Sequence, residues 1–372
     1  MFANANDSHY IHKLSKTKDC PMSLSQRTPA GPVLLATLAV LALTGGCSRE
    51  PESAAGTINI YSARHYQSDD ALYQAFTDAT GIEVRRIEGT DDALIERILQ
   101  EGAASPADIL FTVDAGRLWR AEQAGVFQSV ESPVLRQRIP AQLRHPEGKW
   151  FGFSSRARLI FYDPARIEPG AISRYEDLAD PRWAGELCVR SGGHIYNLSL
   201  MASMIAHHGL EEAEAWARGV VANLARNPQG GDTDQIRAVS AGECGIAVAN
   251  SYYFARLMGS DDPADRAVVD KLRWVFPNQD DRGTHINISG AGIVANAPNA
   301  GQALAFLEFL ASPDAQTRFA RGNNEYPVVA GAALENPALE KLGPFKADDL
   351  DAALYGVHQA DAQRALDRAG WQ

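Results

Sequence analysis

Strand-like and helix-like segments alternate from residue 57 to residue 124, and this alternation constrains the fold more than any other feature of the chain. The helix-like segments carry apolar residues at helical spacing on one face. We expect strands over 57–61, 82–87 and 107–112 and helices over 68–80, 91–100 and 115–124. Such alternation is typical of an α/β protein whose mainly parallel sheet is covered by helices on both faces.

A long extended segment, residues 150–162, interrupts this rhythm and indicates a second domain. It reads Trp-Phe-Gly-Phe-Ser-Ser-Arg-Ala-Arg-Leu-Ile-Phe-Tyr and stops at Asp163-Pro164. Residues 272–276 form a predicted strand that would return the chain. We therefore predict two domains joined by two extended crossings. Domain 1 is discontinuous and comprises 57–150 and 277–372, and domain 2 comprises 151–276.

The first 47 residues are expected to form an export signal rather than part of the fold. An apolar run over 33–43 is too short for a comfortable membrane span and fits a signal peptide. Thr-Gly-Gly precedes Cys47, which favours lipoprotein cleavage with a lipid anchor on Cys47; ordinary signal cleavage is the alternative. Residues 1–21 precede Met22 and are interpreted as a mis-called start. Residues 48–56 form a tether.

Charge and cysteine usage narrow the function classes. The formal net charge is −11, which argues against nucleic-acid binding because phosphate contacts need a basic face.

Once Cys20 and Cys47 are assigned to the leader and the anchor, Cys188 and Cys244 remain. An even pair in an oxidising compartment predicts a disulfide between them. Two buried free thiols are the alternative.

Tyrosines stand at the ends of three predicted elements. Arg64-His65-Tyr66 follows the first strand, Tyr196 precedes a helix, and Tyr252-Tyr253 follows the strand over 245–250. Phenolate oxygens suit a hard, highly charged cation such as Fe(III). In a continuing strand Tyr252 and Tyr253 would point to opposite faces. The hypothesis of a shared metal ion therefore requires a turn or helix start at that pair.

Four segments together resemble the periplasmic ferric-iron-binding proteins of ABC uptake systems, in their tyrosine and histidine branch. They are Ile-Tyr-Ser-Ala-Arg-His-Tyr, Trp-Ala-Gly-Glu-Leu-Cys-Val-Arg-Ser, Tyr-Asn-Leu-Ser-Leu and Ala-Asn-Ser-Tyr-Tyr. The resemblance implies a two-domain type II periplasmic-binding-protein fold with the metal in the interdomain cleft. It implies Fe(III) ligands at His65, Tyr66, Tyr196, Tyr252 and Tyr253, and counter-charges beyond these ligands at Arg156 and Arg256.

Two alternatives stay open at this site. Some relatives in that branch leave the histidine uncoordinated, so His65 is expected either to bind the ion or to lie beside it. Asp91 or Asp92, in the run Gly-Thr-Asp-Asp-Ala, would be an unusual carboxylate ligand.

The resemblance implies a periplasmic, monomeric binding protein that delivers Fe(III) to a separate membrane permease and its ATPase. The alternative keeps the fold and changes the ligand to an anion or small organic molecule, of the sulfate, polyamine or phosphonate type. An enzyme is not expected, because the chain lacks a nucleophile elbow, a His-Glu-x-x-His motif and a glycine-rich phosphate loop.

Overall fold

Nine strands make one mixed sheet in the order β2-β1-β3-β8-β4-β6-β5, with β7 and β9 also paired to β4. The structure is a computed structural model that describes residues 56–64 and 66–372. The predicted signal peptide, most of the tether and His65 lie outside the described residues. The strands are β1 Thr57–Ser62, β2 Glu83–Glu88, β3 Ile109–Val113, β4 Phe151–Tyr162, β5 Leu187–Cys188, β6 Ile246–Asn250, β7 Arg273–Val275, β8 Ile286–Ile293 and β9 Tyr326–Pro327.

Parallel pairing is confined to two places in this sheet. β1 lies parallel to β2 and β3, and β5 lies parallel to β6. All pairs that involve β4 or β8 are antiparallel. The sequence predicts mainly parallel sheets because helices separate the early strands. The two long crossing strands run in opposite directions and so add antiparallel pairs.

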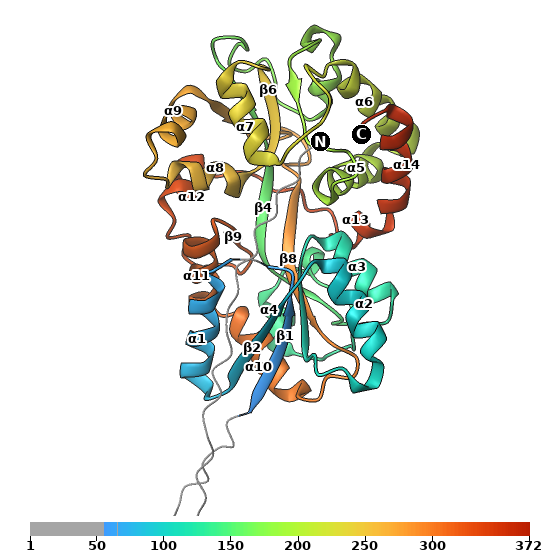
Figure 1. Cartoon of the computed structure of the whole chain (residues 1–372), viewed down its shortest axis with the longest axis vertical. Helices are drawn as coiled ribbons and strands as arrows, with labels where there is room; N and C mark the ends of the chain where they lie inside the picture. The colour runs from blue at the N-terminus through green and yellow to red at the C-terminus, as the bar shows by residue number, and fades with distance from the viewer. Residues whose placement is uncertain (1–55, 65) are drawn as a thin grey trace, which may run out of the picture. The chain divides into compact units, whose positions relative to one another are not determined.

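The long segment around residue 150 is a single twelve-residue strand, β4, buried along its whole length. Its first half, up to Ala157, pairs with β8, and its second half, from Arg158, pairs with β6. Figure 1 shows β4 and β8 side by side in the middle of the molecule. β7 pairs with the second half of β4, so the chain returns through β8 rather than through 272–276.

Helices pack against the strands at both ends of the sheet order, β2-β1-β3-β8 at one end and β4-β6-β5 at the other. They are α1 Asp69–Thr80, α2 Asp91–Glu101, α3 Ala115–Gln123, α4 Pro133–Arg138, α5 Ile195–His208, α6 Leu210–Ala222, α7 Asp232–Ala241, α8 Ser251–Met258, α9 Pro263–Lys271, α10 Ala300–Leu310, α11 Pro313–Asn323, α12 Pro337–Leu342, α13 Ala353–Val357 and α14 Gln359–Ala369. No helix among the described residues has the length and apolar character needed to span a membrane.

Terminal residues explain where these helices begin and end. α1 ends at Gly81, whose φ of 71° is a left-handed conformation that glycine adopts without penalty. At α2 the Thr90 hydroxyl accepts a hydrogen bond from the amide of Ala93 and so caps the first turn. α5 begins at Ile195, so Tyr196 lies in its first turn and does not precede the helix as the sequence suggested; the His194 ring accepts the amide of Tyr196 and caps this turn.

The C-terminal helices return to the middle of the chain. α13 packs against α3 and α5, and α14 packs against α5 and α6. The sequence-based division places α14 with domain 1, whereas its packing partners α5 and α6 lie within 151–276. The division at residues 150 and 277 stays a prediction, and this packing favours assigning α14 to domain 2.

Asp114 links α3, α5 and β8 by hydrogen bonds, beside the site described below. It caps α3 and has φ 95°, a strained conformation for a residue other than glycine. Its buried carboxylate accepts hydrogen bonds from Ser199 Oγ of α5 and Asn287 Nδ2 of β8, both at 2.8 Å. These bonds fix the start of α5 relative to β8.

A disulfide joins Cys188 of β5 to Cys244, just before β6, with 5.9 Å between the Cα atoms. This is the pairing expected from the sequence. Since β5 and β6 are neighbouring parallel strands, the bridge holds together the edge of the sheet that carries Tyr252 and Tyr253 at its far end.

Candidate metal site

The chain changes from strand to helix at the tyrosine pair. β6 ends at Asn250 and α8 begins at Ser251, so Tyr252 and Tyr253 lie in the first turn of a helix. Their ring centroids are 4.2 Å apart. The helix start required by the shared-ion hypothesis is therefore present, and both phenols can reach the same space.

Tyr196 meets this pair from the N-terminal end of α5. Its hydroxyl oxygen lies 3.0 Å from the hydroxyl oxygen of Tyr252, within hydrogen-bond distance. The His194 ring contacts the Tyr196 ring edge to face, at 4.5 Å between centroids. His194, which is not among the predicted ligands, thus fixes both the backbone and the ring of Tyr196.

Tyr66 joins the three other tyrosines from the end of the sheet formed by β2, β1 and β3. It follows β1, and the guanidinium carbon of the buried Arg64 lies 4.8 Å from the centroid of its ring. Tyr66, Tyr196, Tyr252 and Tyr253 line one cavity of about 260 Å³ together with Ala63, Arg64, Val113 and Arg256. The structure thus brings four of the five predicted ligands together, and the fifth, His65, lies outside the described residues.

Burial makes these phenols poor acids without a metal. It raises the pKa of Tyr66, an effect increased by the nearby Glu325 carboxylate. Burial also raises the pKa of Tyr196, with Tyr253 beside it, and the pKa of Tyr252, with Tyr196 beside it. Because an ordinary phenol has a pKa near 10, all three are neutral at physiological pH until a cation replaces their protons.

Arginines surround the phenol rings. The guanidinium carbons of Arg156 and Arg158 each lie 5.9 Å from the Tyr196 centroid, and that of Arg190 lies 5.2 Å from it. Arg256 lies 5.9 Å from the Tyr252 centroid and 5.8 Å from the Tyr253 centroid. Positive charge at these distances favours the phenolate form of a tyrosine over the neutral phenol. It also offsets the negative charge that ionised phenols bring to the site.

The buried guanidinium of Arg156 keeps N–H groups that no acceptor in the described part of the chain occupies. It is 2% exposed, and its Nη1 donates to Ser289 Oγ at 3.1 Å. Within the described part of the chain its Nε and Nη2 have no hydrogen-bond partner. Buried guanidinium groups are normally paired, so these two N–H groups are available to a phenolate or a ligand oxygen in the cavity.

Carboxylates take no part in the lining of the tyrosine cavity. Asp91 pairs with Arg117 at 2.6 Å, and Asp92 pairs with Arg120 at 2.9 Å. Burial raises the pKa of Asp91 to about 6, with Arg117 opposing the shift. Across residues 56–64 and 66–372, no three His, Cys, Asp or Glu side chains gather in a way that could hold a metal ion.

A family model described as "Bacterial extracellular solute-binding protein" matches residues 104–354. The chain belongs to this family. Its solute-binding fold therefore carries the tyrosine cavity between the start of α1 on one side and the starts of α5 and α8 on the other. The described residues that line the cavity follow β1, stand at the end of β3, or belong to α5 and α8.

Two relatives of this solute-binding chain have names that refer to iron. Iron uptake protein A2 of Synechocystis is 53% identical over 326 residues, which is 87% of this chain and 92% of that protein. The Fe(3+)-binding periplasmic protein of Serratia marcescens is 29% identical over 340 residues, 91% of this chain and 95% of that one. These names describe iron uptake and ferric-iron binding, and neither names an enzyme.

A solved structure confirms the predicted fold. A Trichodesmium protein (IdiA, FutA), in complex with iron and citrate ligands, superposes with a TM-score of 0.83 at 55% identity. The match covers 85% of this chain and 100% of the other. The expectation of an α/β solute-binding protein, and the resemblance to ferric-iron-binding proteins on which it depended, are both confirmed.

Two buried acids behind this solute-binding site escaped sequence analysis. Asp232, at the start of α7, accepts from Arg158 at 3.0 Å and from Arg190 at 3.1 Å. Glu325, just before β9, accepts from Arg64 at 3.1 Å. Their arginine partners are 42 to 261 residues away along the chain, so no local signal could have found them.

Proposed function

We propose that this protein captures Fe(III) in the tyrosine cavity and delivers it to an ABC-transporter permease with its separate ATPase. The observation that carries the proposal is the 3.0 Å approach of the Tyr196 and Tyr252 hydroxyls in a cavity also lined by Tyr66 and Tyr253. The iron-related names of the relatives support the same ligand. Capture and delivery need no catalysis, so we propose a transport protein and not an enzyme.

The ligand set we propose is His65, Tyr66, Tyr196, Tyr252 and Tyr253. Four phenolates and Fe(III) leave a net charge of −1, which needs compensation in a largely buried site. Arg156 offers two unpartnered buried donors, and Arg256 lies over two of the rings. Both would stabilise the phenolates and orient them toward the ion.

Closure and location complete the proposal. Tyr66 follows β1, whereas Tyr196, Tyr252 and Tyr253 belong to α5 and α8, so one ion held by all of them would favour a closed arrangement of two domains. We propose a periplasmic monomer, exported by residues 1–47 and held at the membrane by lipid on Cys47.

The ligand class is tested by a thermal-shift screen of the purified protein with Fe(III), sulfate, a polyamine and a phosphonate. We expect Fe(III) to raise the melting temperature in a saturable manner, because a ligand that binds only the folded state stabilises it. Stabilisation by one of the organic or anionic ligands, with none by Fe(III), would favour the alternative function.

Iron affinity should fall as pH falls. The pKa values of Tyr66, Tyr196 and Tyr252 are raised by burial, so each ligating phenol must release a proton when the metal binds. The apparent affinity should therefore drop by about tenfold per pH unit for each phenol that ionises. Competition titrations between pH 7.5 and pH 5.5 measure this slope, and a Tyr196→Phe variant should show a shallower one. An affinity that does not change with pH would contradict phenolate ligation.

A further inference from the structure

A buried arginine, Arg158, contacts residues at both helix starts that carry tyrosines of the candidate metal site. It is 2% exposed and lies in the second half of β4, directly opposite Asn250 of β6. Its Nη2 donates to Asn197 Oδ1 at 2.7 Å, and its Nη1 donates to Asn250 Oδ1 at 2.9 Å. Asn197 follows Tyr196 in α5, and Asn250 directly precedes α8. One guanidinium therefore joins the start of α5 to the start of α8.

Asp232 holds this guanidinium in place. Its carboxylate is fully buried, and Oδ2 accepts from Arg158 Nη1 at 3.0 Å and from the Asn250 amide at 2.8 Å. The other oxygen, Oδ1, accepts from Arg190 Nη1 at 3.1 Å. A buried charge that loses its partner is strongly unfavourable, so the Arg158–Asp232 pair has one well-defined arrangement.

Both asparagines depend on this pair for their own positions. Asn250 occupies the N-cap position of α8, where an asparagine side chain usually accepts an amide of the first turn. Its side chain makes no such capping bond and binds Arg158 instead. The Asn197 side chain donates to the carbonyls of Arg190 and Ser191, both at 3.0 Å. The same network thus reaches from the segment before α5 to the start of α8.

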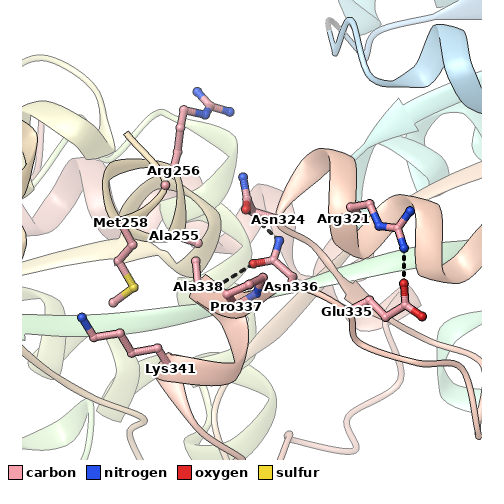
Figure 2. A pocket seen from close by; sticks show the side chains of 11 residues that line it. Ala255, Arg256, Met258, Arg321, Asn324, Glu335, Asn336, Pro337, Ala338 and Lys341 are labelled. Atoms are coloured by element: carbon pink, nitrogen blue, oxygen red, sulfur yellow. Dashed lines mark hydrogen bonds and ion pairs between the residues drawn. The ribbon is translucent and has the colours of Figure 1, made fainter. Parts of the chain in front are cut away.

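Packing along α8 is open on one side. The helix has eight residues, or about two turns. A cavity of about 500 Å³ lies between α8, the end of α11 and α12. Figure 2 shows Met258 of α8 and Lys341 of α12 at this cavity, with the Arg256 side chain pointing away from both. A short helix with a cavity along one side depends more on the contacts at its start.

We propose that Arg158 is a positioning residue for the metal site. Held by Asp232, it sets the starts of α5 and α8 relative to each other before any metal binds. The Tyr196 and Tyr252 hydroxyls consequently stand 3.0 Å apart in the metal-free protein. This inference rests on the proposed iron function. The role of Arg158 is geometric as well as electrostatic, because a lysine would keep the charge but not the planar fork that reaches three acceptors.

Amide hydrogen exchange of the iron-free protein tests this role without any metal. We expect the first turns of α5 and α8 to exchange faster in Arg158→Lys than in the wild type, because the contact between them is lost. Iron affinity should also fall by about 10–100-fold, the usual cost of losing a group that orients metal ligands. Asp232→Asn should show both effects, because one amide oxygen cannot replace two carboxylate oxygens.

Arg166→Lys is the matched control. Arg166 also joins two segments, because it pairs with Glu186 at 2.7 Å and donates to Gly242 O at 3.0 Å. It does not line the tyrosine cavity. Its replacement by lysine should therefore leave both iron affinity and exchange at the two helix starts unchanged.

Wild-type exchange at both helix starts in Arg158→Lys and Asp232→Asn would overturn the positioning role. Wild-type iron affinity in both variants would also overturn it, since the geometry of the fork would then not matter. If Arg158→Lys does not fold, Asp232→Asn decides by the same two criteria. Failure of the iron proposal looks different: the wild type would bind no Fe(III), while exchange at the helix starts would still respond to Arg158→Lys.

Discussion

Replacement of both Tyr196 and Tyr252 by phenylalanine is expected to abolish useful Fe(III) binding. The two hydroxyls lie 3.0 Å apart and both tyrosines line the cavity, and the change removes both oxygens while keeping the rings. Loss of groups that only support metal ligands already costs about 10–100-fold in affinity. Loss of two ligands should therefore exceed about 100-fold. Competition against nitrilotriacetate measures the affinity.

The matched control removes a buried phenol elsewhere. Tyr326 is 8% exposed, its hydroxyl has no partner in the described part of the chain, and it does not line the tyrosine cavity. Tyr326→Phe should therefore leave iron affinity unchanged. Unchanged iron affinity in the Tyr196→Phe, Tyr252→Phe variant, with its fold intact, would show that the proposed ligand set is wrong.

Replacement of Glu325 by alanine should cause the largest loss of stability. Glu325 is 1% exposed, and its carboxylate accepts from Arg64 Nη1 at 3.1 Å, Ser154 Oγ at 2.6 Å and Ser289 Oγ at 3.2 Å. Its removal leaves Arg64 paired with Asp69 alone and takes the acceptor from buried donors, and a buried polar group left unsatisfied costs about 1–3 kcal/mol. Urea denaturation should show this decrease in the free energy of unfolding.

An exposed ion pair provides the control for this effect. Glu83 pairs with Arg85 at 3.0 Å, but both side chains are more than half exposed. Glu83→Ala should leave the free energy of unfolding nearly unchanged, because solvent screens an exposed ion pair. Equal effects of the two substitutions would contradict the role of the buried network.

Since Glu325 also raises the pKa of Tyr66, its replacement should shift the pH dependence of iron binding to lower pH.

Local patterns predicted the elements that carry the site. The strand before Tyr252 is visible in the sequence as an apolar run over 245–250, whereas the helix start at that pair was a requirement of the shared-ion hypothesis and not a prediction from the pattern. The length of β4 was equally visible as a long extended segment over 150–162. In both cases the information lies within a dozen neighbouring residues, which is the range over which periodicity is informative.

Contacts between distant residues could not be predicted in this way. The Arg64–Glu325 pair spans 261 positions and the Arg158–Asp232 pair spans 74. The role of His194 could not be predicted either, because its ring accepts the Tyr196 amide only where α5 begins at Ile195. The antiparallel pairing of β4 with β8 likewise depends on the path of the whole chain.

The most direct test of the central claim is an absorption spectrum of the purified protein during titration with ferric nitrilotriacetate. Phenolate coordinated to Fe(III) gives a broad charge-transfer band in the visible range. We predict that the band grows to one equivalent of iron and bleaches on acidification, as protons return to the phenols. A folded protein that shows no such band would contradict the assignment of Tyr66, Tyr196, Tyr252 and Tyr253 as iron ligands.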